Sequence, residues 1–345
     1  MSRMRFAEGG WVLVAALLLM LFLALWALTP AFLRAAERPP GDGRDPATYG
    51  FNLTDLRLPE HAPLQAALIH RDMVPARDSV PSLIDAASAS EEKPRKGPFL
   101  TTKDLVIGVE IDGETRAYPL LLMNVHEAMG DTLADTPLLV TWHWPSGVTA
   151  VYDARINGEL RSFGISGLVA GGGQLLYLRN TDGSTGDEPL IAQLTGSSVT
   201  GDAFTLRPIR HVVTTWKDWH ELHPDTTVVA GDAAMSRRYK DGKPDTYFHS
   251  SGLLFDVPVP EGGPEAKSPA VVLEHNGHSQ LVTKADLLRS AGVLELNLNG
   301  EHLVTIRLTD GGRRLTVDAP PSVTVRRGLW HLVHAFGPWE SALKH

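Results

Sequence analysis

The sequence predicts an α+β protein dominated by β-structure, built from two related strand–hairpin–helix units behind an N-terminal transmembrane helix. Three observations lead to this fold class. There is a long apolar run near the start, a high density of turn signals between short β-like segments, and a pair of similarities between distant segments. Runs of strands with few helices favour this class over a doubly wound parallel sheet.

The apolar run extends from Trp11 to Leu33 without a charged residue. About 20 helical residues span a hydrocarbon core of ~30 Å, and Trp11 and Trp26 stand near the two ends, where indoles favour the interface. Because Arg3 and Arg5 precede the run, the positive-inside rule predicts a cytoplasmic N-terminus and an extracytoplasmic remainder. A cleaved signal peptide is the disfavoured alternative, since its apolar region is usually about 7–15 residues and no clear A-x-A site follows here.

The composition shifts divide the chain into five predicted segments. They are a cytoplasmic tail (1–10), a transmembrane anchor (11–33), a stalk rich in Pro and Gly (34–48), a first, larger half of the main domain (49–235) and a second, shorter half (236–345). The membrane is therefore a predicted partner through residues 11–33, and a protein partner in the membrane or periplasm stays open.

Cysteine and charge exclude several functional classes. The chain has no Cys, which excludes a disulfide framework, a zinc-thiolate site, an iron–sulfur cluster and a Cys nucleophile. The formal charge is -8. Two of the 32 basic and one of the 40 acidic residues precede residue 34, so residues 34–345 carry -9. Such an acidic domain is not expected to bind nucleic acid, which needs a basic face. The sequence identifies no cofactor.

Two hairpins are predicted in the first half. Leu105–Ile111 is β-like, Asp112-Gly113 is a turn signal, and Thr115–Tyr118 returns as a second strand. A second hairpin joins Leu138–Trp142 to Val148–Tyr152. Asp-Gly and Asn-Gly turns recur along the rest of the chain, which favours a domain rich in sheets.

Two pairs of segments suggest an internal repeat. Val109–Gly113 resembles Leu273–Gly277, 164 residues later, and the spacing W-x₃-H-x₃-P that begins at Trp216 recurs 114 residues later from Trp330. We therefore predict two copies of one unit, the second shorter by 50 residues, with the extra material of the first including 160–205. Chance similarity between two hairpins and two amphipathic helices is the alternative.

Histidines offer the first candidates for chemistry. His126-Glu127 opens the zinc-hydrolase pattern H-E-x-x-H, but Gly130 takes the place of the second His. His126 could serve as a single metal ligand or a general base, although a hydrogen-bonded structural role is favoured. His143 stands between two tryptophans, and strand alternation, with the indoles on one face and His143 on the other, is favoured over an aromatic pocket.

Three further motifs fail on inspection. Ser166 lies in a near match to the nucleophile elbow G-x-S-x-G, but Leu168 takes the last position. Gly171–Gly173 lacks the residues of a phosphate loop. His220 and His223 share a helical face with two tryptophans, which favours packing on a sheet over metal binding.

Several stretches together resemble a known family. In chain order they are Asp45–Leu53, Val106–Val109, Arg116–Pro119, His126-Glu127 with Asp131, Phe163–Gly167, Gln193–Gly196, Thr215–Trp219 and His223–Thr226. Their order is similar to that of the bacterial family called domain of unknown function 3179, over roughly residues 45–345 and more weakly beyond 235. The resemblance implies an extracytoplasmic or membrane-anchored protein, and the family has no established activity.

The resemblance also implies site residues. His126, Glu127, Asp131 and Ser166 occupy matched positions and are the candidate catalytic residues, and His126 and His143 are the candidate metal ligands.

This chain departs from the family pattern at two places. Where the family usually has Tyr-Cys-Pro-Leu-Cys-Gly, His143 and Ser146 replace the two cysteines. Ile191 replaces a family Trp. A thiol pair would suggest redox or soft-metal chemistry, so any activity that needs it is lost or altered here.

Three functions remain. The favoured one is a membrane-anchored extracytoplasmic binding or accessory module, because no complete catalytic constellation is present. The second is a metal-dependent or acid/base enzyme with a site around His126, Glu127, His143 and Ser166. The third is a single-helix subunit of a larger membrane complex.

Overall fold

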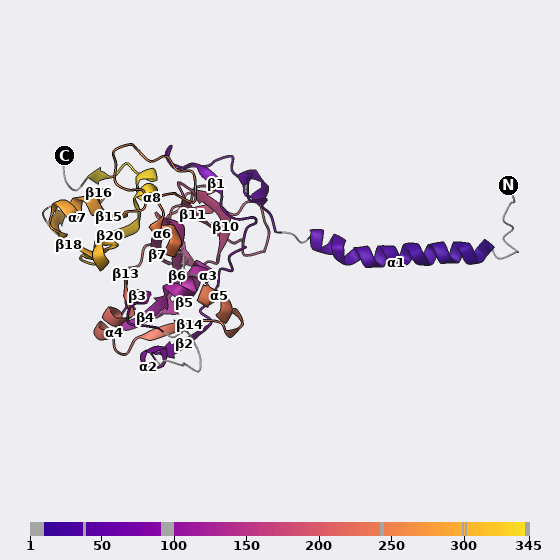
Figure 1. Cartoon of the computed structure of the whole chain (residues 1–345), viewed down its shortest axis with the longest axis horizontal. Coiled ribbons are helices and arrows are strands. Elements are labelled where there is room, and N and C mark those ends of the chain that lie inside the picture. Colours follow the sequence, from indigo (N-terminus) through magenta and orange to yellow (C-terminus); the bar gives the residue numbers. More distant parts are fainter. Residues whose placement is uncertain are drawn as a thin grey trace. The chain divides into compact units, whose positions relative to one another are not determined.

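The structure is a computed structural model that describes residues 10–36, 39–90, 100–241, 245–298, 300 and 302–341. It separates into two units, Met1–Pro40 and Gly41–His345. The first unit contains α1 (Gly10–Ala36) (Figure 1). Within the described residues, no helix has both the length and the apolar character that crossing a membrane requires. Residues 1–9 of the predicted tail, including Arg3 and Arg5, and residues 37–38 of the predicted stalk lie outside the described residues.

The unit Gly41–His345 is α+β and β-dominant with several sheets, which confirms the predicted class at that level (Figure 1). One sheet has the order β13-β3-β4-β14-β2. Its strands are β13 (His211–Thr215), β3 (Leu105–Ile111), β4 (Glu114–Pro119), β14 (Thr227–Ala230) and β2 (Ser82–Asp85). The β3–β4 hairpin turns where predicted, and Asp112 (φ 48°) and Gly113 (φ 85°) take the left-handed conformation that Asp-Gly turns favour.

A sheet of the second half has the order β20-β15-β16-β21. Its strands are β20 (Thr324–Leu329), β15 (Pro269–His275), β16 (His278–Thr283) and β21 (Glu340–Ser341). In both sheets a central hairpin has an antiparallel strand on one side and a parallel strand on the other. In both, a helix follows the hairpin and another follows the antiparallel strand. These helices are α3 (Leu120–His126), α4 (Trp216–Leu222), α7 (Lys284–Arg289) and α8 (Trp330–Ala335). The shared order is an observation, and the repeat itself stays a prediction.

Apart from β1, which precedes the first hairpin in the chain, the remaining strands lie in the intervals between the hairpin and the antiparallel strand. The first half inserts the sheets β5-β6-β7, β1-β10-β11-β12 and β8-β9, and the second inserts β17-β18-β19. Their bounds are β5 (Ala128–Leu133), β6 (Thr136–His143), β7 (Val148–Asp153), β8 (Arg155–Ile156), β9 (Glu159–Leu160), β1 (Leu64–Ala66), β10 (Phe163–Ala170), β11 (Gly173–Leu178), β12 (Leu190–Ala192), β17 (Val293–Leu298), β18 (His302–Thr309) and β19 (Arg314–Asp318). The larger insertion lies in the first half and includes residues 160–205.

Short helical segments complete the chain. They are η2 (Pro46–Tyr49), α2 (Ala86–Ser90), η3 (Trp144–Ser146), η4 (Ala233–Met235), α5 (Ser236–Asp241), α6 (Asp245–His249) and η5 (Asp310–Gly312). Local chemistry explains where the helices begin. Thr215 caps α4 by accepting from the backbone N of Asp218 at 3.1 Å, and Thr283 and Asp286 form a full capping box on α7.

Alternation along β6 positions the predicted site residues. Leu138, Val140 and Trp142 pack in the core beneath α3 and β3, whereas Leu139 faces the opposite core. His143 therefore lies on the face opposite Trp142, as strand alternation predicts. The strand ends at His143, so Trp144 follows in η3 and packs edge-on against Tyr247 at 5.3 Å.

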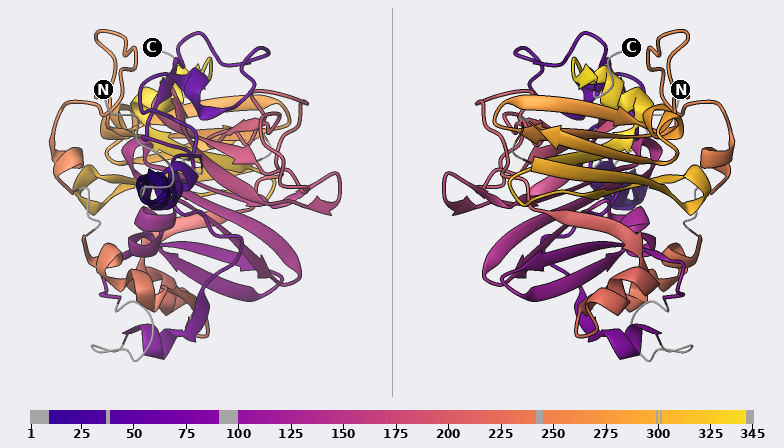
Figure 2. Two further views of the ribbon diagram at one scale, coloured as in Figure 1. Left: turned by 90° about the vertical axis from the view of Figure 1, so that its right-hand side faces the viewer. Right: turned by 90° about the vertical axis from the view of Figure 1, so that its left-hand side faces the viewer.

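The two halves meet where β7 of the first half lies beside β20 of the second. In both views of Figure 2, the orange and yellow strands of the second half lie above the purple strands of the first. Residues of these two strands also line the two cavities described below.

We predict that Gly108→Ala destabilises the fold. A Cβ at Gly108, on β3, would overlap the ring of Trp219, which is only 3% exposed. Overpacking of this kind typically costs about 1–3 kcal/mol. Urea denaturation of the full chain measures the change in the free energy of unfolding. Gly252→Ala is the matched control, because a Cβ there meets nothing within 4 Å. Equal midpoints for both variants would contradict the prediction.

Candidate functional site

His126, the last residue of α3, is fully buried and joins distant segments. Its Nδ1 is 2.8 Å from the carbonyl of Pro75, and its Nε2 is 2.9 Å from the hydroxyl of Tyr239. Burial lowers the pKa of His126 below its usual value. Both ring nitrogens are thus occupied by hydrogen bonds, which matches the structural role favoured from the sequence.

Asp131 forms a buried ion pair. Arg116 on β4 donates to both Asp131 carboxylate oxygens at 2.7 Å, and the Tyr118 hydroxyl donates to one of them at 2.6 Å. Burial, and then the Asp131 charge, raise the pKa of Tyr118 well above its usual range. The partners of Asp131 belong to β4 and β5, and Arg116 also donates to Thr227 on β14 at 3.0 Å, so the pair holds three strands together.

Ser166 lies within a bulge of β10 and is fully buried. Its hydroxyl donates to the carbonyl of Leu175 at 2.5 Å and accepts from the backbone N of Leu168 at 3.0 Å. Gly167 at φ 81° makes the turn between these positions. The hydroxyl therefore satisfies backbone groups that the bulge leaves without ladder partners.

Glu127 is buried and has a strongly raised pKa. It ends α3 in the left-handed conformation (φ 56°), and its carboxylate accepts a hydrogen bond from the amide of Gln174. Burial raises its pKa to about 8, although the Gln174 hydrogen bond acts in the opposite direction. A carboxyl group with this pKa exchanges its proton near neutral pH, which is the property of a general acid or base.

His143 is the last residue of β6, and Ser146 is the last residue of η3. His143 Nδ1 and the Ser146 hydroxyl are 2.7 Å apart, and His143 stacks on Phe255 with ring centroids 6.4 Å apart. Burial and the nearby His331 lower the pKa of His143 to about 3, and burial lowers that of His331 to about 4. Both imidazoles are neutral at physiological pH.

The predicted residues are not brought into one open site. His126, Asp131 and Ser166 have separate sets of partners. The backbone segments that carry Glu127 and His143 are hydrogen bonded to each other. The backbone N of Trp142, the neighbour of His143, donates to the Glu127 carbonyl at 2.8 Å. Over the described part of the chain, no group of three or more His, Cys, Asp or Glu side chains is arranged to hold a metal ion. None of the five residues lines either cavity described next.

A cleft of about 810 Å³ opens between the two halves of the unit. Its apolar wall includes Leu105, Leu120, Trp142, Phe248, Leu315 and Leu329. Its charged residues are the cationic Lys267, Lys284, Arg313, Arg314 and Arg327 and the acidic Glu265 and Asp310. Five cations against two acids make this cleft basic, although the chain as a whole carries -8.

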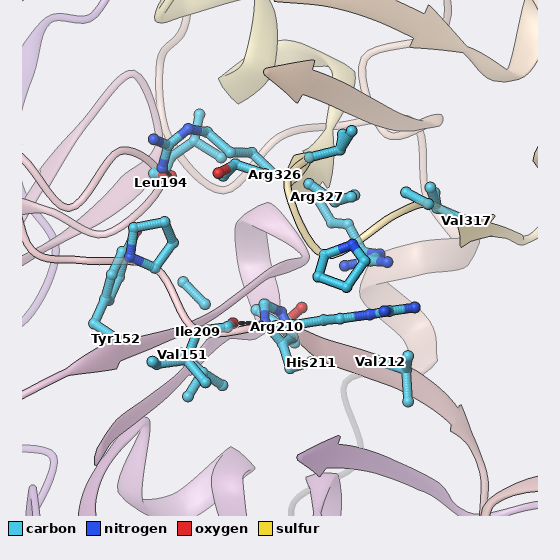
Figure 3. A pocket seen from close by; sticks show the side chains of 18 residues that line it. Val151, Tyr152, Leu194, Ile209, Arg210, His211, Val212, Val317, Arg326 and Arg327 are labelled. Atoms are coloured by element: carbon cyan, nitrogen blue, oxygen red, sulfur yellow. Dashed lines mark hydrogen bonds between the residues drawn. The ribbon is translucent and has the colours of Figure 1, made fainter. Parts of the chain in front are cut away.

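A second, smaller cavity of about 70 Å³ adjoins the cleft (Figure 3). It lies between β7, β13 and β20, and Thr149 and Arg327 line both cavities. Arg326, also on its wall, is held by the Glu274 carboxylate at 2.7 Å and by the carbonyl of Leu194 at 2.9 Å. Thr149 and Arg327 therefore form a wall that the two cavities share.

Reasoning from the sequence missed these cationic residues. Lys267, Lys284 and Arg313 stand on separate loops and helix starts of the second half, and no spacing rule connects them. The pair Arg326-Arg327 inside a β-like segment was the available signal, because two adjacent charges in a strand leave one of them facing inward.

Comparison with known proteins adds one match. A family model described as "Protein of unknown function (DUF3179)" matches residues 77–326. The matched span contains all five predicted site residues and Arg210, and begins after the Asp45–Leu53 stretch. No curated protein and no solved structure matches the chain.

We predict that Glu127 makes stability fall as pH rises. Its folded pKa of about 8 lies above the ordinary value of 4.5, so the folded state holds the proton more tightly. The stabilisation is complete below pH 4.5 and is lost as pH rises through 8. Each pKa unit corresponds to about 1.4 kcal/mol, so the free energy of unfolding of the parent chain should fall by a few kcal/mol between pH 5 and pH 8. Glu127→Gln should not show this fall. Urea denaturation of the full chain at both pH values measures it.

Glu110→Gln provides the matched control, because Glu110 is exposed on β3. This variant should keep the pH dependence of the parent chain. The prediction fails if Glu127→Gln and the parent lose the same free energy of unfolding between the two pH values.

Proposed function

The chain belongs to the DUF3179 family of proteins of unknown function, and since the description of that family names no activity, we propose a function from the cleft. The domain binds a small anionic ligand that has an apolar part. Residues 11–33 anchor it to a membrane, with the domain on the extracytoplasmic side. The observation that carries the binding proposal is a basic cleft with an apolar wall in an acidic protein.

The charges of the cleft favour an anion. Lys284 and Arg313 form no ion pair with any described residue. Lys267 is held in place by the carbonyls of Tyr247 and Ser250, at 2.6 and 2.9 Å, neither of which neutralises its charge. Low-dielectric walls lined by one sign of charge focus the potential and raise the local concentration of a ligand of opposite sign.

The apolar wall favours a ligand that is more than a simple ion. Pockets that bind small molecules are typically about 300–1,000 Å³, mostly apolar, with a few placed polar groups. The cleft, at about 810 Å³, has this size and this mixture. An organic anion can place its apolar part against Leu120, Leu315 and Leu329 while its charge faces the cations.

The predicted catalytic residues support binding more than catalysis. The polar atoms of His126, Asp131 and Ser166 form hydrogen bonds within the fold. Glu127 and His143 are only 7% and 5% exposed. An acid/base enzyme needs its reacting groups within hydrogen-bond reach of a substrate, and neither residue lines the cleft.

We predict that organic anions stabilise the full chain reconstituted in lipid nanodiscs. At ten times its Kd a ligand adds about 1.4 kcal/mol, which corresponds to a rise in Tm of about 2–5 °C. Benzoate and phenyl phosphate should raise the Tm, and the neutral benzamide should not. Differential scanning calorimetry measures the shifts.

Ser251→Trp is the blocking variant, because Ser251 is exposed and lines the cleft. Its matched control is Ser236→Trp, an exposed position on α5 away from the cleft. The first should abolish the shift and the second should retain it. Shifts of equal size with benzamide, or shifts that survive Ser251→Trp, would refute binding in the cleft.

The membrane anchor and the orientation are supported by the sequence, through the uncharged run of residues 11–33 and the arginines before it. We predict that a cysteine introduced by Ser236→Cys reacts in intact cells with a membrane-impermeant maleimide. Because the chain has no Cys, this label has no background within the protein. A cysteine introduced by Ser2→Cys should react only after lysis. The reverse pattern, or recovery of the protein in the soluble fraction, would contradict the proposal.

A further inference from the structure

Two guanidinium groups meet in the smaller cavity without a counter-charge. Arg210 precedes β13 and Arg327 lies on β20, and neither forms an ion pair or hydrogen bond with any described residue. Figure 3 shows the ends of the two side chains in the same part of the cavity. Burial, together with the nearby charge of Arg210, lowers the pKa of Arg327 to about 10. Two like charges at close range repel each other, and an anion between them would turn this repulsion into attraction.

Two buried polar atoms of the same cavity also lack partners. His211 is 9% exposed and Thr149 is 3% exposed, and both line the cavity. His211 Nε2 and Thr149 Oγ1 have no hydrogen-bond partner among the described residues. A buried polar atom without a partner costs about 1–3 kcal/mol, so these atoms mark a place where a ligand supplies the missing bonds.

The tautomer of His211 specifies what that ligand must offer. Its Nδ1 lies 3.1 Å from the carbonyl of Ile209, and a carbonyl only accepts, so Nδ1 carries the proton. In the neutral ring Nε2 is then an acceptor. The ligand has to present negative oxygens to the arginines and a hydroxyl proton to His211.

We propose that the cavity between β7, β13 and β20 binds a phosphoryl group that keeps one proton. The guanidinium groups of Arg210 and Arg327 hold its anionic oxygens, the Thr149 hydroxyl donates to it, and its P–OH donates to His211 Nε2. Arginine suits this role because its planar fork matches phosphate oxygens. Sulfate and carboxylate carry no such proton and leave Nε2 unsatisfied.

The wall that the two cavities share extends this assignment. Thr149 and Arg327 line both, so a phosphate monoester can place its phosphoryl group in the smaller cavity and its organic part along the apolar wall of the cleft. This step rests on the proposed function, since it names the ligand class of the same cleft. Free phosphate would use the smaller cavity alone.

The test is calorimetric titration of the full chain in nanodiscs at pH 5.5, where a phosphate ester retains one proton on most molecules. The probes are inorganic phosphate, phenyl phosphate and sulfate. Both phosphates should bind, sulfate should bind at least tenfold more weakly, and phenyl phosphate should bind more tightly than inorganic phosphate. If sulfate binds as well as phosphate, the role of His211 is wrong. If phenyl phosphate binds no more tightly, the extension to a monoester is wrong.

Variants separate the site from general charge effects. Arg210 is exposed, so Arg210→Gln should fold normally, and it should weaken both phosphates at least tenfold. Arg327→Gln should do the same. Arg237→Gln removes one exposed cation on α5, away from both cavities, and should change nothing. Unchanged affinity in a folded Arg210→Gln variant would overturn the site.

The outcomes also separate this inference from the proposed function. If benzoate raises the Tm in a manner sensitive to Ser251→Trp while no phosphate binds, the phosphoryl site is refuted and the cleft stands. If phosphate binds but no organic anion shifts the Tm, the site stands and the cleft proposal fails.

Discussion

The contact between β7 and β20 is the constraint on which both cavities depend. It places the second half against the insertion of the first, and each cavity opens along this line. The alternation of β20 then decides the fate of two adjacent arginines. Arg326 is held by Glu274 and by the carbonyls of Leu194 and Thr195, which ties the halves together. Arg327 faces the other way, into the cavities, with no acidic partner.

The polar motifs shared with the family serve the architecture of this chain. His126 joins the segment before β2 to α5, Asp131 joins β5 to β4, and Ser166 completes a bulge in β10. Each of these buried residues forms at least two hydrogen bonds, because polar groups in a core are normally hydrogen bonded. The polar groups of His143 and Ser146 are arranged in the same way. His143 and Ser146 hydrogen bond to each other across η3 and remain neutral in an apolar setting.

The basic cleft gives the acidic domain a local charge opposite to its net charge. Repulsion from the overall negative charge disfavours loose contact with anions elsewhere on the surface, whereas the cleft attracts them at short range. In the proposed function this arrangement favours selectivity, because an anion would be retained only where cations and an apolar wall occur together. One part of that surface sets the strictest requirements on a ligand. It consists of the unpaired guanidinium groups, the buried His211 nitrogen and the Thr149 hydroxyl.

Local signals in the sequence determined the hairpin at Asp112-Gly113, the Thr215 cap and the alternation that separates His143 from Trp142. Each depends on residues within a few positions of one another, where turn chemistry and strand periodicity act directly. Tertiary structure alone decided which polar side chains have hydrogen-bond or ion-pair partners and which have none among the described residues. Arg210 and Arg327 belong to different halves, and their meeting depends on how β7 packs against β20, a long-range packing result that no local pattern encodes.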